Sequence, residues 1–242
     1  MESVISIQHL SKSFGNNEVL KDFNLDVFKG ENVVVLGKSG SGKSVLIKCI
    51  IGLISPDQGS IRVLDQDVLQ LNSDEMDLMR VKVGFLFQSN ALYDSMSVRE
   101  NLEFPLRRHG NNLSPDEMDK AVKEALESVG LAHTEYMMPA ELSGGMKKRI
   151  AIARTLILKP DIILYDEPTT GLDPITGKEI SDLILEIQKV YKTSSVIISH
   201  DMHCVKIVAN RIVMLIDGKC YAEGTYEELT ASADDRIKQF FD

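Results

Sequence analysis

The chain has 242 residues, 43% hydrophobic and 26% charged, a composition typical of a folded globular protein and unlike that of disordered chains. Its 36 acidic and 27 basic side chains give a net charge of -9, which repels polyphosphate backbones and argues against non-specific nucleic-acid binding as the main activity. The length predicts one large domain, or one domain with a sizeable insertion.

Short runs rich in β-branched and aromatic residues predict strands along most of the chain. Those expected to form antiparallel strands or hairpins occupy residues 4–10, 19–27, 60–64 and 212–223. Those with the composition of buried parallel strands occupy residues 32–36, 83–87, 161–165 and 195–199. We therefore expect a parallel sheet flanked by a smaller antiparallel β-layer.

Strand patterns stop after Gln88, and helical patterns take over until about Thr155. Ser114 and Glu117 have the spacing of a helix-starting capping box, with proline at the first helical position. The apolar spacing of an amphipathic helix follows at Met118, Ala121, Val122, Ala125, Leu126 and Val129. The sequence predicts a helical subdomain in this middle section.

This interruption defines the expected organisation of a single α/β domain over residues 1–242. Residues 1–88 and 156–242 would form the α/β core with its antiparallel layer, and residues from about 89 to 155 the helical subdomain. No secretory signal or membrane-spanning run is visible, so we expect a cytosolic chain. The three cysteines lack metal-ligand spacing and are expected to be buried free thiols.

A glycine-rich loop follows the predicted strand at residues 32–36 and precedes a helical run. Its residues are Gly37, Lys38, Ser39, Gly40, Ser41, Gly42, Lys43 and Ser44. This is the GxxxxGKS pattern of a phosphate loop, in which curled backbone N–H groups and a helix N-terminus bind an anion. Lys43 would bridge the β- and γ-phosphates, and the Ser44 hydroxyl suits Mg²⁺. A chance glycine-rich turn is the alternative, but the strand context makes it rare.

Two adjacent carboxylates, Asp166 and Glu167, follow the predicted strand at residues 161–165. Strand alternation directs neighbouring side chains to opposite sides, so we expect Asp166 in a Mg²⁺ shell and Glu167 facing an attacking water. By itself this pattern is more often a strand meeting a solvated turn. Its position downstream of a phosphate loop favours the catalytic interpretation.

A turn of Ser143, Gly144 and Gly145 precedes a basic, helix-forming run, and Asp166 follows 23 positions after Ser143. The turn alone carries little information. The ordered set of motifs is the phosphate loop, Gln88, this turn, Asp166 with Glu167, Asp173 and His200. Together they resemble the nucleotide-binding subunit of ATP-binding cassette (ABC) transporters over essentially the whole chain.

The resemblance implies an ATPase of the ABC fold, a P-loop NTPase core with ATP and Mg²⁺ as cofactors. The implied catalytic residues are Glu167, His200, Lys43 and Gln88. The implied metal ligands are Ser44, Gln88 and Asp166. Phe14 matches the aromatic residue that stacks on adenine, Gln88 the sensor of the γ-phosphate and Mg²⁺, and His200 the switch histidine. An ordinary core phenylalanine and a structural histidine are the alternatives for Phe14 and His200.

In this family the serine-glycine turn contacts the ATP held by a second copy. Ser143, Gly144 and Gly145 would close on that γ-phosphate, with the helix N-terminus supplying partial positive charge. Asp173 matches the loop that contacts the opposite subunit. The resemblance therefore implies a homodimer that encloses two ATP molecules and opens after hydrolysis.

Two positions depart from the commonest pattern of the family. Met146 stands where Gln is frequent, and Val45 stands where Thr often supplements the phosphate contacts. Neither change removes an essential group, and the backbone N–H of Val45 is still expected to reach phosphate. We expect activity to survive both.

Several segments are similar to the ATPase of Mla-type intermembrane phospholipid transporters. They are residues 40–45, 85–93 and 169–175, Met146, and the tail at residues 236–241. This branch implies an integral inner-membrane permease and a periplasmic MCE-type lipid-binding protein as partners, and phospholipid as cargo. It also implies a peripheral location on the cytoplasmic face of the inner membrane, with no nucleic-acid partner.

A mixed apolar and polar stretch at residues 90–96 and 104–106 follows Gln88. It could receive a short helix of the permease, or it could pack within its own subdomain.

Three other functions are alternatives to phospholipid transport: an ABC transporter subunit for an amino acid, metal or lipoprotein, an ABC ATPase outside transport, and a non-enzymatic interaction protein. Lys43, Glu167 and His200 are intact, which disfavours the last.

Overall fold

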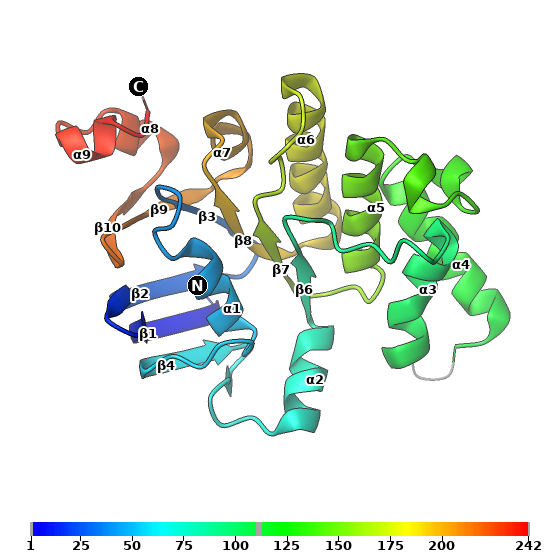
Figure 1. Ribbon diagram of the computed structural model, residues 1–242, viewed down its shortest axis with the longest axis horizontal. Coiled ribbons are helices and arrows are strands. Elements are labelled where there is room, and N and C mark those ends of the chain that lie inside the picture. Colours follow the sequence, from blue (N-terminus) through cyan, green and yellow to red (C-terminus); the bar gives the residue numbers. More distant parts are fainter. Residues whose placement is uncertain (1, 110–112, 242) are drawn as a thin grey trace.

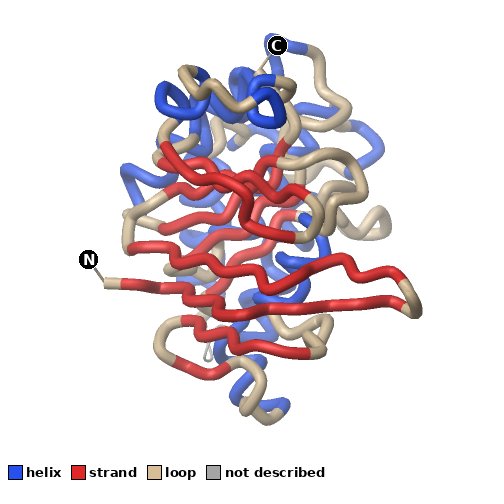
Figure 2. The backbone as a smooth tube through the Cα atoms, turned by 90° about the vertical axis from the view of Figure 1, so that its left-hand side faces the viewer, coloured by secondary structure: helices blue, strands red, loops and turns tan. Residues whose placement is uncertain are grey.

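The computed structural model describes residues 2–109 and 113–241 and contains two β-sheets with helices around them (Figure 1). The smaller sheet has four antiparallel strands in the order β2-β1-β4-β5. Its strands are β1 (Ser3–Phe14), β2 (Asn17–Phe28), β4 (Gln58–Val63) and β5 (Gln66–Asp67). This sheet is the expected antiparallel layer, and Figure 2 shows its long strands ending in a projecting hairpin.

The larger sheet has six strands in the order β10-β9-β3-β8-β7-β6. Its strands are β3 (Asn32–Leu36), β6 (Val83–Leu86), β7 (Ile162–Asp166), β8 (Ser194–Ser199), β9 (Arg211–Ile216) and β10 (Lys219–Gly224). The hairpin expected at residues 212–223 is present as β9 and β10. However, β9 pairs in parallel with β3, so this hairpin extends the main sheet and does not belong to the antiparallel layer.

The helices follow the strands in a largely alternating order. They are α1 (Lys43–Ile50), α2 (Ser73–Val81), α3 (Val98–His109), α4 (Pro115–Ser128), α5 (Gly144–Leu156), α6 (Pro174–Tyr191), α7 (Met202–Val208), α8 (Tyr226–Thr230) and α9 (Asp235–Lys238). Short 3₁₀ turns occupy Ala132–Thr134 and Pro139–Glu141. The expected α/β architecture, a largely parallel main sheet with a flanking antiparallel layer, is confirmed.

The core lies on both faces of the main sheet, and β3 shows why. All five β3 residues are buried, and alternate side chains enter different hydrophobic clusters. Val33 and Val35 pack with α1 and the antiparallel sheet, whereas Val34 and Leu36 pack on the side of α5, α6 and α7. A central parallel strand covered on both faces has this continuous apolar sequence.

The helices α3, α4 and α5 lie together at one end of the molecule, away from the antiparallel sheet (Figure 1). As expected, α4 begins with a capping box in which Ser114 accepts a hydrogen bond from the N–H of Glu117. Helix α5 also contacts β6 and α6, so it joins this helical part to the main sheet. The exact subdomain boundaries at 88/89 and 155/156 stay a prediction.

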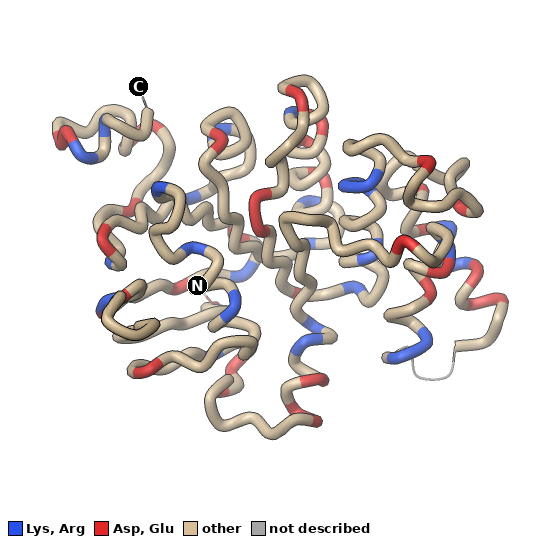
Figure 3. The backbone as a smooth tube through the Cα atoms, viewed as in Figure 1, with Lys and Arg blue, Asp and Glu red and all other residues tan. Residues whose placement is uncertain are grey.

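Within the described ranges, we find no helix that is both long and apolar enough to cross a lipid bilayer. Acidic and basic residues are interspersed over the strand-rich and the helical part alike (Figure 3). The three cysteines are free; Cys49 and Cys204 are buried, as expected, and Cys220 is only partly buried.

Candidate functional site

Four neighbouring parallel strands end at the same edge of the main sheet. The phosphate loop follows β3 at Gly37, His200 follows β8, Glu167 follows β7, and Gln88 lies just beyond β6. In an open α/β sheet, ligands bind outside the carboxyl ends of such strands. The topology therefore brings together predicted site residues that lie up to 163 positions apart in sequence.

A cavity of about 470 Å³ opens at this edge. Its walls include Phe14, Lys43, Ser44, Gln88, Glu167 and His200. Other predicted contacts in the lining are Ser39, Gly40, Gly42 and Val45. The volume falls in the range of small-molecule sites, so a nucleotide-sized ligand fits.

The phosphate loop curls around the side chain of its own lysine. Lys43 Nζ donates hydrogen bonds to the carbonyl oxygens of Gly37 at 2.7 Å and Lys38 at 3.0 Å. Burial lowers the pKa of Lys43, an effect that the nearby Glu167 and Asp166 carboxylates oppose. Gly42 has a φ of 103°, and a Cβ there would lie 2.7 Å from Val19 Cγ1, so only glycine fits at the start of α1.

Hard oxygen ligands meet beside the loop. Ser44 Oγ, at the start of α1, donates a hydrogen bond to Asp166 Oδ1 at 3.2 Å. Burial raises the pKa of Asp166 and Glu167 adds to the rise, whereas the Ser44 hydrogen bond opposes it. A divalent cation bound here would offset both the burial of the Asp166 charge and its repulsion by Glu167, so the arrangement favours cation binding. The donor set fits Mg²⁺, and Ser44 and Asp166 would hold it.

Glu167 takes its position by a backbone turn and not by strand alternation. Strand β7 ends at Asp166, and Glu167 has a positive φ of 52°, so the alternation expected from the sequence does not extend to it. Its Oε2 accepts a hydrogen bond from Thr170 Oγ1 at 3.2 Å and lies 2.8 Å from His200 Nδ1. The Glu167 side chain is buried, whereas that of His200 is 64% exposed. The Glu167 carboxylate therefore lies in the cavity wall, within hydrogen-bond distance of the solvent-accessible His200 imidazole.

The serine-glycine turn lies elsewhere. Ser143 caps α5, where its Oγ accepts a hydrogen bond from the N–H of Met146 at 3.2 Å. Ser143 and Gly144 are exposed, and none of the three turn residues lines the cavity of their own chain. A Cβ on Gly145 would lie 2.6 Å from Thr176 Cγ2, so a larger residue would require the Thr176 side chain to move.

Asp173 lies next to this turn and not next to the phosphate loop. It caps α6, and its carboxylate accepts hydrogen bonds from the N–H groups of Ile175 and Thr176 and from the Thr176 hydroxyl. Because Gly145 packs against Thr176, the two segments expected to face a second subunit form one exposed surface.

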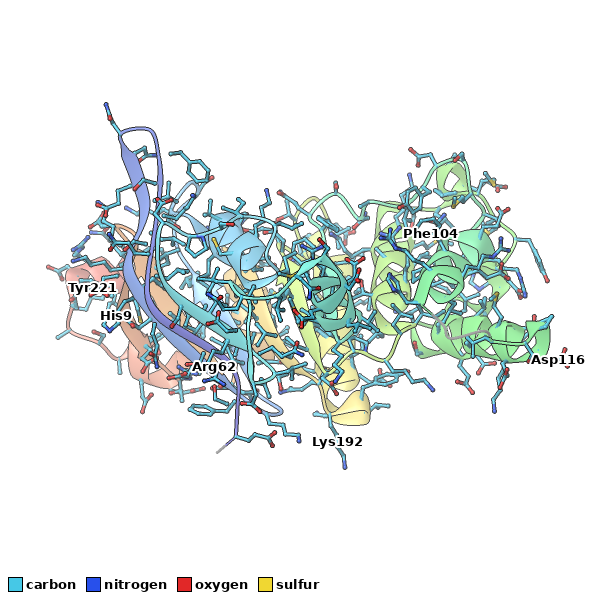
Figure 4. The ribbon with its side chains drawn as sticks, turned by 90° about the horizontal axis from the view of Figure 1, so that it is seen from below. His9, Arg62, Phe104, Asp116, Lys192 and Tyr221 are labelled. Carbon is cyan, nitrogen blue, oxygen red and sulfur yellow. The ribbon has the colours of Figure 1, made fainter. Side chains whose placement is uncertain are left out.

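Phe14 stands at the tip of β1 and is 50% exposed, with its side chain in the cavity lining. Gln88 is also exposed, and its carbonyl oxygen accepts a hydrogen bond from Lys148 Nζ at 3.1 Å. In the stretch expected to meet a membrane partner, the Tyr93 and Phe104 rings are both partly exposed and 5.0 Å apart (Phe104 is labelled in Figure 4). Leu106 of that stretch is buried, so it packs within its own chain.

Two residues near the site were not singled out from the sequence. Thr170 orients the Glu167 carboxylate, and Lys148 on α5 is 1% exposed and holds the Gln88 carbonyl. Burial lowers the pKa of Lys148 to about 8. Lys148 lies one turn before the buried Ile152, on the same apolar face of α5. A lysine at an apolar position of the helical pattern is the sequence signal that could have identified it.

Comparison with known proteins agrees with this geometry. A family profile described as "ABC transporter" matches residues 20–170. The intermembrane phospholipid transport system ATP-binding protein MlaF of Haemophilus influenzae is 38% identical over 239 residues, which are 99% of this chain and 90% of MlaF. The methionine import ATP-binding protein MetN of Campylobacter jejuni is 37% identical over 252 residues, 98% of this chain and 75% of MetN.

The fold also matches solved ATP-binding cassettes. A dimeric, post-hydrolysis structure of the cassette MJ0796 bound to ADP and Pi has a TM-score of 0.82 and 33% identity, covering 91% of this chain and 98% of the other. Both the family match and the relatives span most of the chain. The protein therefore belongs to the ABC transporter family, as an ATP-binding subunit that hydrolyses ATP.

Proposed function

We propose that this ATPase forms a homodimer around two ATP molecules and drives an inner-membrane permease that moves phospholipid between membranes. The observation that carries the phospholipid assignment is the 38% identity to MlaF over 99% of the chain. The motif-level similarity in residues 85–93, 169–175 and 236–241 supports the same branch.

The catalytic roles follow from the cavity wall. Glu167 is the general base, because its carboxylate is buried, fixed by Thr170 and directed to the space beside the phosphate loop. His200, within hydrogen-bond distance of Glu167, contacts the γ-phosphate and holds the base in place. Lys43 balances negative charge on the β- and γ-phosphates from within the loop.

The remaining nucleotide contacts come from backbone and from aromatic stacking. Backbone N–H groups of the phosphate loop would bind the phosphates, and the N-terminus of α1 would add partial positive charge. Phe14 stacks on the adenine from the tip of β1. Mg²⁺ held by Ser44, Asp166 and Gln88 would supply charge stabilisation on the transferring phosphoryl group. Gln88 joins this set through its side chain, while its carbonyl stays tied to Lys148.

The dimer is proposed because half of the site faces away from the cavity. Ser143, Gly144, Gly145 and Asp173 occupy one exposed surface outside the cavity lining. The N-terminus of α5 on this surface suits a phosphate held by a second copy. An isologous pair would use the same surface twice and complete two sites. The dimeric arrangement of the related MJ0796 cassette supports this geometry.

Transport would couple to this cycle through α5 and Gln88. Helix α5 begins at the serine-glycine turn, and its Lys148 donates a hydrogen bond to the carbonyl oxygen of Gln88, just beyond β6. The exposed Tyr93 and Phe104 lie further along the same segment and are proposed to receive the permease. The proposed partners are an integral inner-membrane permease and a periplasmic MCE-type lipid-binding protein, with this chain peripheral on the cytoplasmic face.

An amino acid is the second candidate cargo, because MetN is almost as similar as MlaF. The two assignments differ in the membrane subunit. Copurification of the full complex from its native membrane in mild detergent, followed by mass spectrometry of subunits and bound lipid, distinguishes them. We expect a permease with an MCE-type protein and copurifying phospholipid; recovery of an amino-acid permease would overturn the lipid assignment.

A further inference from the structure

The Phe14 ring stands at the tip of the β1–β2 hairpin, beyond the part of β1 that pairs with β4. Strand β1 pairs with β4 as far as Ser11, opposite Gln58, and beyond that point its residues pair with β2 in a two-stranded ribbon. Figure 2 shows this ribbon projecting past the other strands. An isolated two-stranded hairpin is marginally stable in water, so the ring needs support from outside the ladder.

On the β2 side, the N–H of Lys21 donates a hydrogen bond to the Gly218 carbonyl at 2.8 Å, and on the β1 side one carboxylate supplies the support. Asp57, in the turn that leads into β4, accepts hydrogen bonds from Lys12 Nζ at 2.7 Å and from the N–H of Ser13 at 2.6 Å. Its own N–H donates to the Ser11 carbonyl at 2.8 Å. Three consecutive residues before Phe14 are therefore tied to one side chain and its backbone. These contacts hold the pKa of Asp57 below its usual value, the Lys12 hydrogen bond contributing most and the Ser13 N–H next.

The same carboxylate also places a cation beside the ring. Lys12 Nζ lies 5.4 Å from the centroid of the Phe14 ring, within the range of a cation–π interaction. The Lys12 side chain is only 15% exposed. Neither Lys12 nor Asp57 lines the cavity.

We propose that Asp57 and Lys12 are positioning residues that hold the Phe14 ring as a platform for the nucleotide base. The inference rests on the proposed stacking of adenine on Phe14, and it adds the contacts of Asp57 and Lys12 that orient the Phe14 ring. Affinity for the base half of the nucleotide thereby depends on a carboxylate outside the cavity. Affinity for the phosphate half does not, because the phosphate loop makes its own contacts with Lys43 and α1.

The test compares binding of ADP with binding of inorganic pyrophosphate, both with Mg²⁺, to the full-length protein by titration calorimetry. ADP contains the base and pyrophosphate does not, so a ring-positioning role affects only the former. Loss of base stacking in Phe14→Ala is expected to weaken ADP binding by roughly tenfold. Asp57→Ala and Lys12→Met, which retains the apolar stem, should weaken it by roughly threefold to tenfold, since a misplaced ring keeps part of its stacking. Pyrophosphate binding should stay unchanged in all three.

The double variant Asp57→Ala with Phe14→Ala should bind ADP as Phe14→Ala does, because a positioning residue has no effect once its ring is absent. Glu2→Ala is the matched control. It breaks an exposed ion pair between Glu2 and Lys29, with an N–O distance of 3.2 Å, at the opposite end of β1 and β2. It should leave both ligands unaffected.

The outcomes separate the two levels of the proposal. If Phe14→Ala binds ADP normally, the stacking role itself is wrong. If Phe14→Ala weakens ADP binding but Asp57→Ala does not, or if Asp57→Ala weakens ADP and pyrophosphate equally, the stacking stands and the positioning role is overturned. Additive losses in the double variant would overturn it as well.

Discussion

The phosphate-loop cavity and the surface of Ser143 and Asp173 are built in opposite ways. Around the cavity, Lys43, Asp166 and Glu167 are buried and bonded to other groups of the same chain. On the other surface, the capping side chains satisfy their own helix ends, while the turn itself stays exposed. The first region has its polar groups bonded within one chain, and the second leaves its turn open to solvent.

This difference separates two requirements of the proposed reaction. Groups that carry charge toward phosphate are preorganised by burial, so they need little rearrangement during hydrolysis. The groups proposed to contact a second copy stay accessible, so they would act only when two chains meet. Nucleotide binding should then not depend on the second region, whereas turnover should depend on both.

The largest effect should come from the cavity. Glu167→Gln removes the proposed base but keeps the shape of the side chain, so turnover should fall about 10²- to 10⁴-fold while ATP binding persists. Lys43→Ala should abolish turnover and also weaken nucleotide binding. Steady-state phosphate release and ATP titration measure the two effects. With ATP, Glu167→Gln should elute as a dimer in gel filtration; a strict monomer, even with the permease present, would contradict the dimer proposal.

A smaller effect is expected from the proposed metal shell. Asp166→Asn removes one carboxylate charge beside Ser44, so the Mg²⁺ concentration required for half-maximal turnover should rise at least about tenfold. Titration of turnover with Mg²⁺ at saturating ATP measures it. Ser181→Ala, which removes a buried hydrogen bond to the Gly177 carbonyl away from the site, serves as a control. An unchanged Mg²⁺ requirement in Asp166→Asn would remove Asp166 from the shell.

The exposed turn allows a substitution that preserves the helix cap. Ser143→Asp still caps α5 but places a negative charge where a partner's phosphate would lie, so turnover should fall about 100-fold through like-charge repulsion. Ser143→Asn is the matched neutral cap and should retain much of the activity. ADP affinity of the isolated chain should be unchanged in both. Equal turnover of the two variants would show that the turn does not face phosphate.

The smallest effect comes from a second capping serine outside both regions. Ser114→Ala removes the capping box of α4 and should lower the free energy of unfolding by about 1 kcal/mol, measured by denaturant titration. Turnover should not change. Ser143→Ala removes a comparable helix cap. If it lowers the free energy of unfolding as much as Ser114→Ala does but it alone also lowers turnover, the two serines differ in function and not in capping.

Much of this architecture could be predicted because its determinants are local. The apolar run of β3, the glycine pattern that follows it and the spacing of Ser114 and Glu117 each act over a few residues. The parallel assignment of β9 could not be predicted this way. Its apolar run resembles that of β3, but the Asp217–Gly218 turn that follows it indicates a hairpin, and only its pairing with β3 places it in the main sheet.

The sequence by itself determined which chemical groups are present and that the phosphate loop joins a buried strand to a helix. Tertiary structure alone decided how Glu167 is directed, because its backbone conformation departs from the strand and its carboxylate is fixed by Thr170 and His200. It also decided that Asp57 supports the hairpin tip near Phe14. The contacts of His200 with Glu167 and of Asp57 with Ser13 join residues from different elements, and a local pattern carries no information about which distant side chain completes a hydrogen bond.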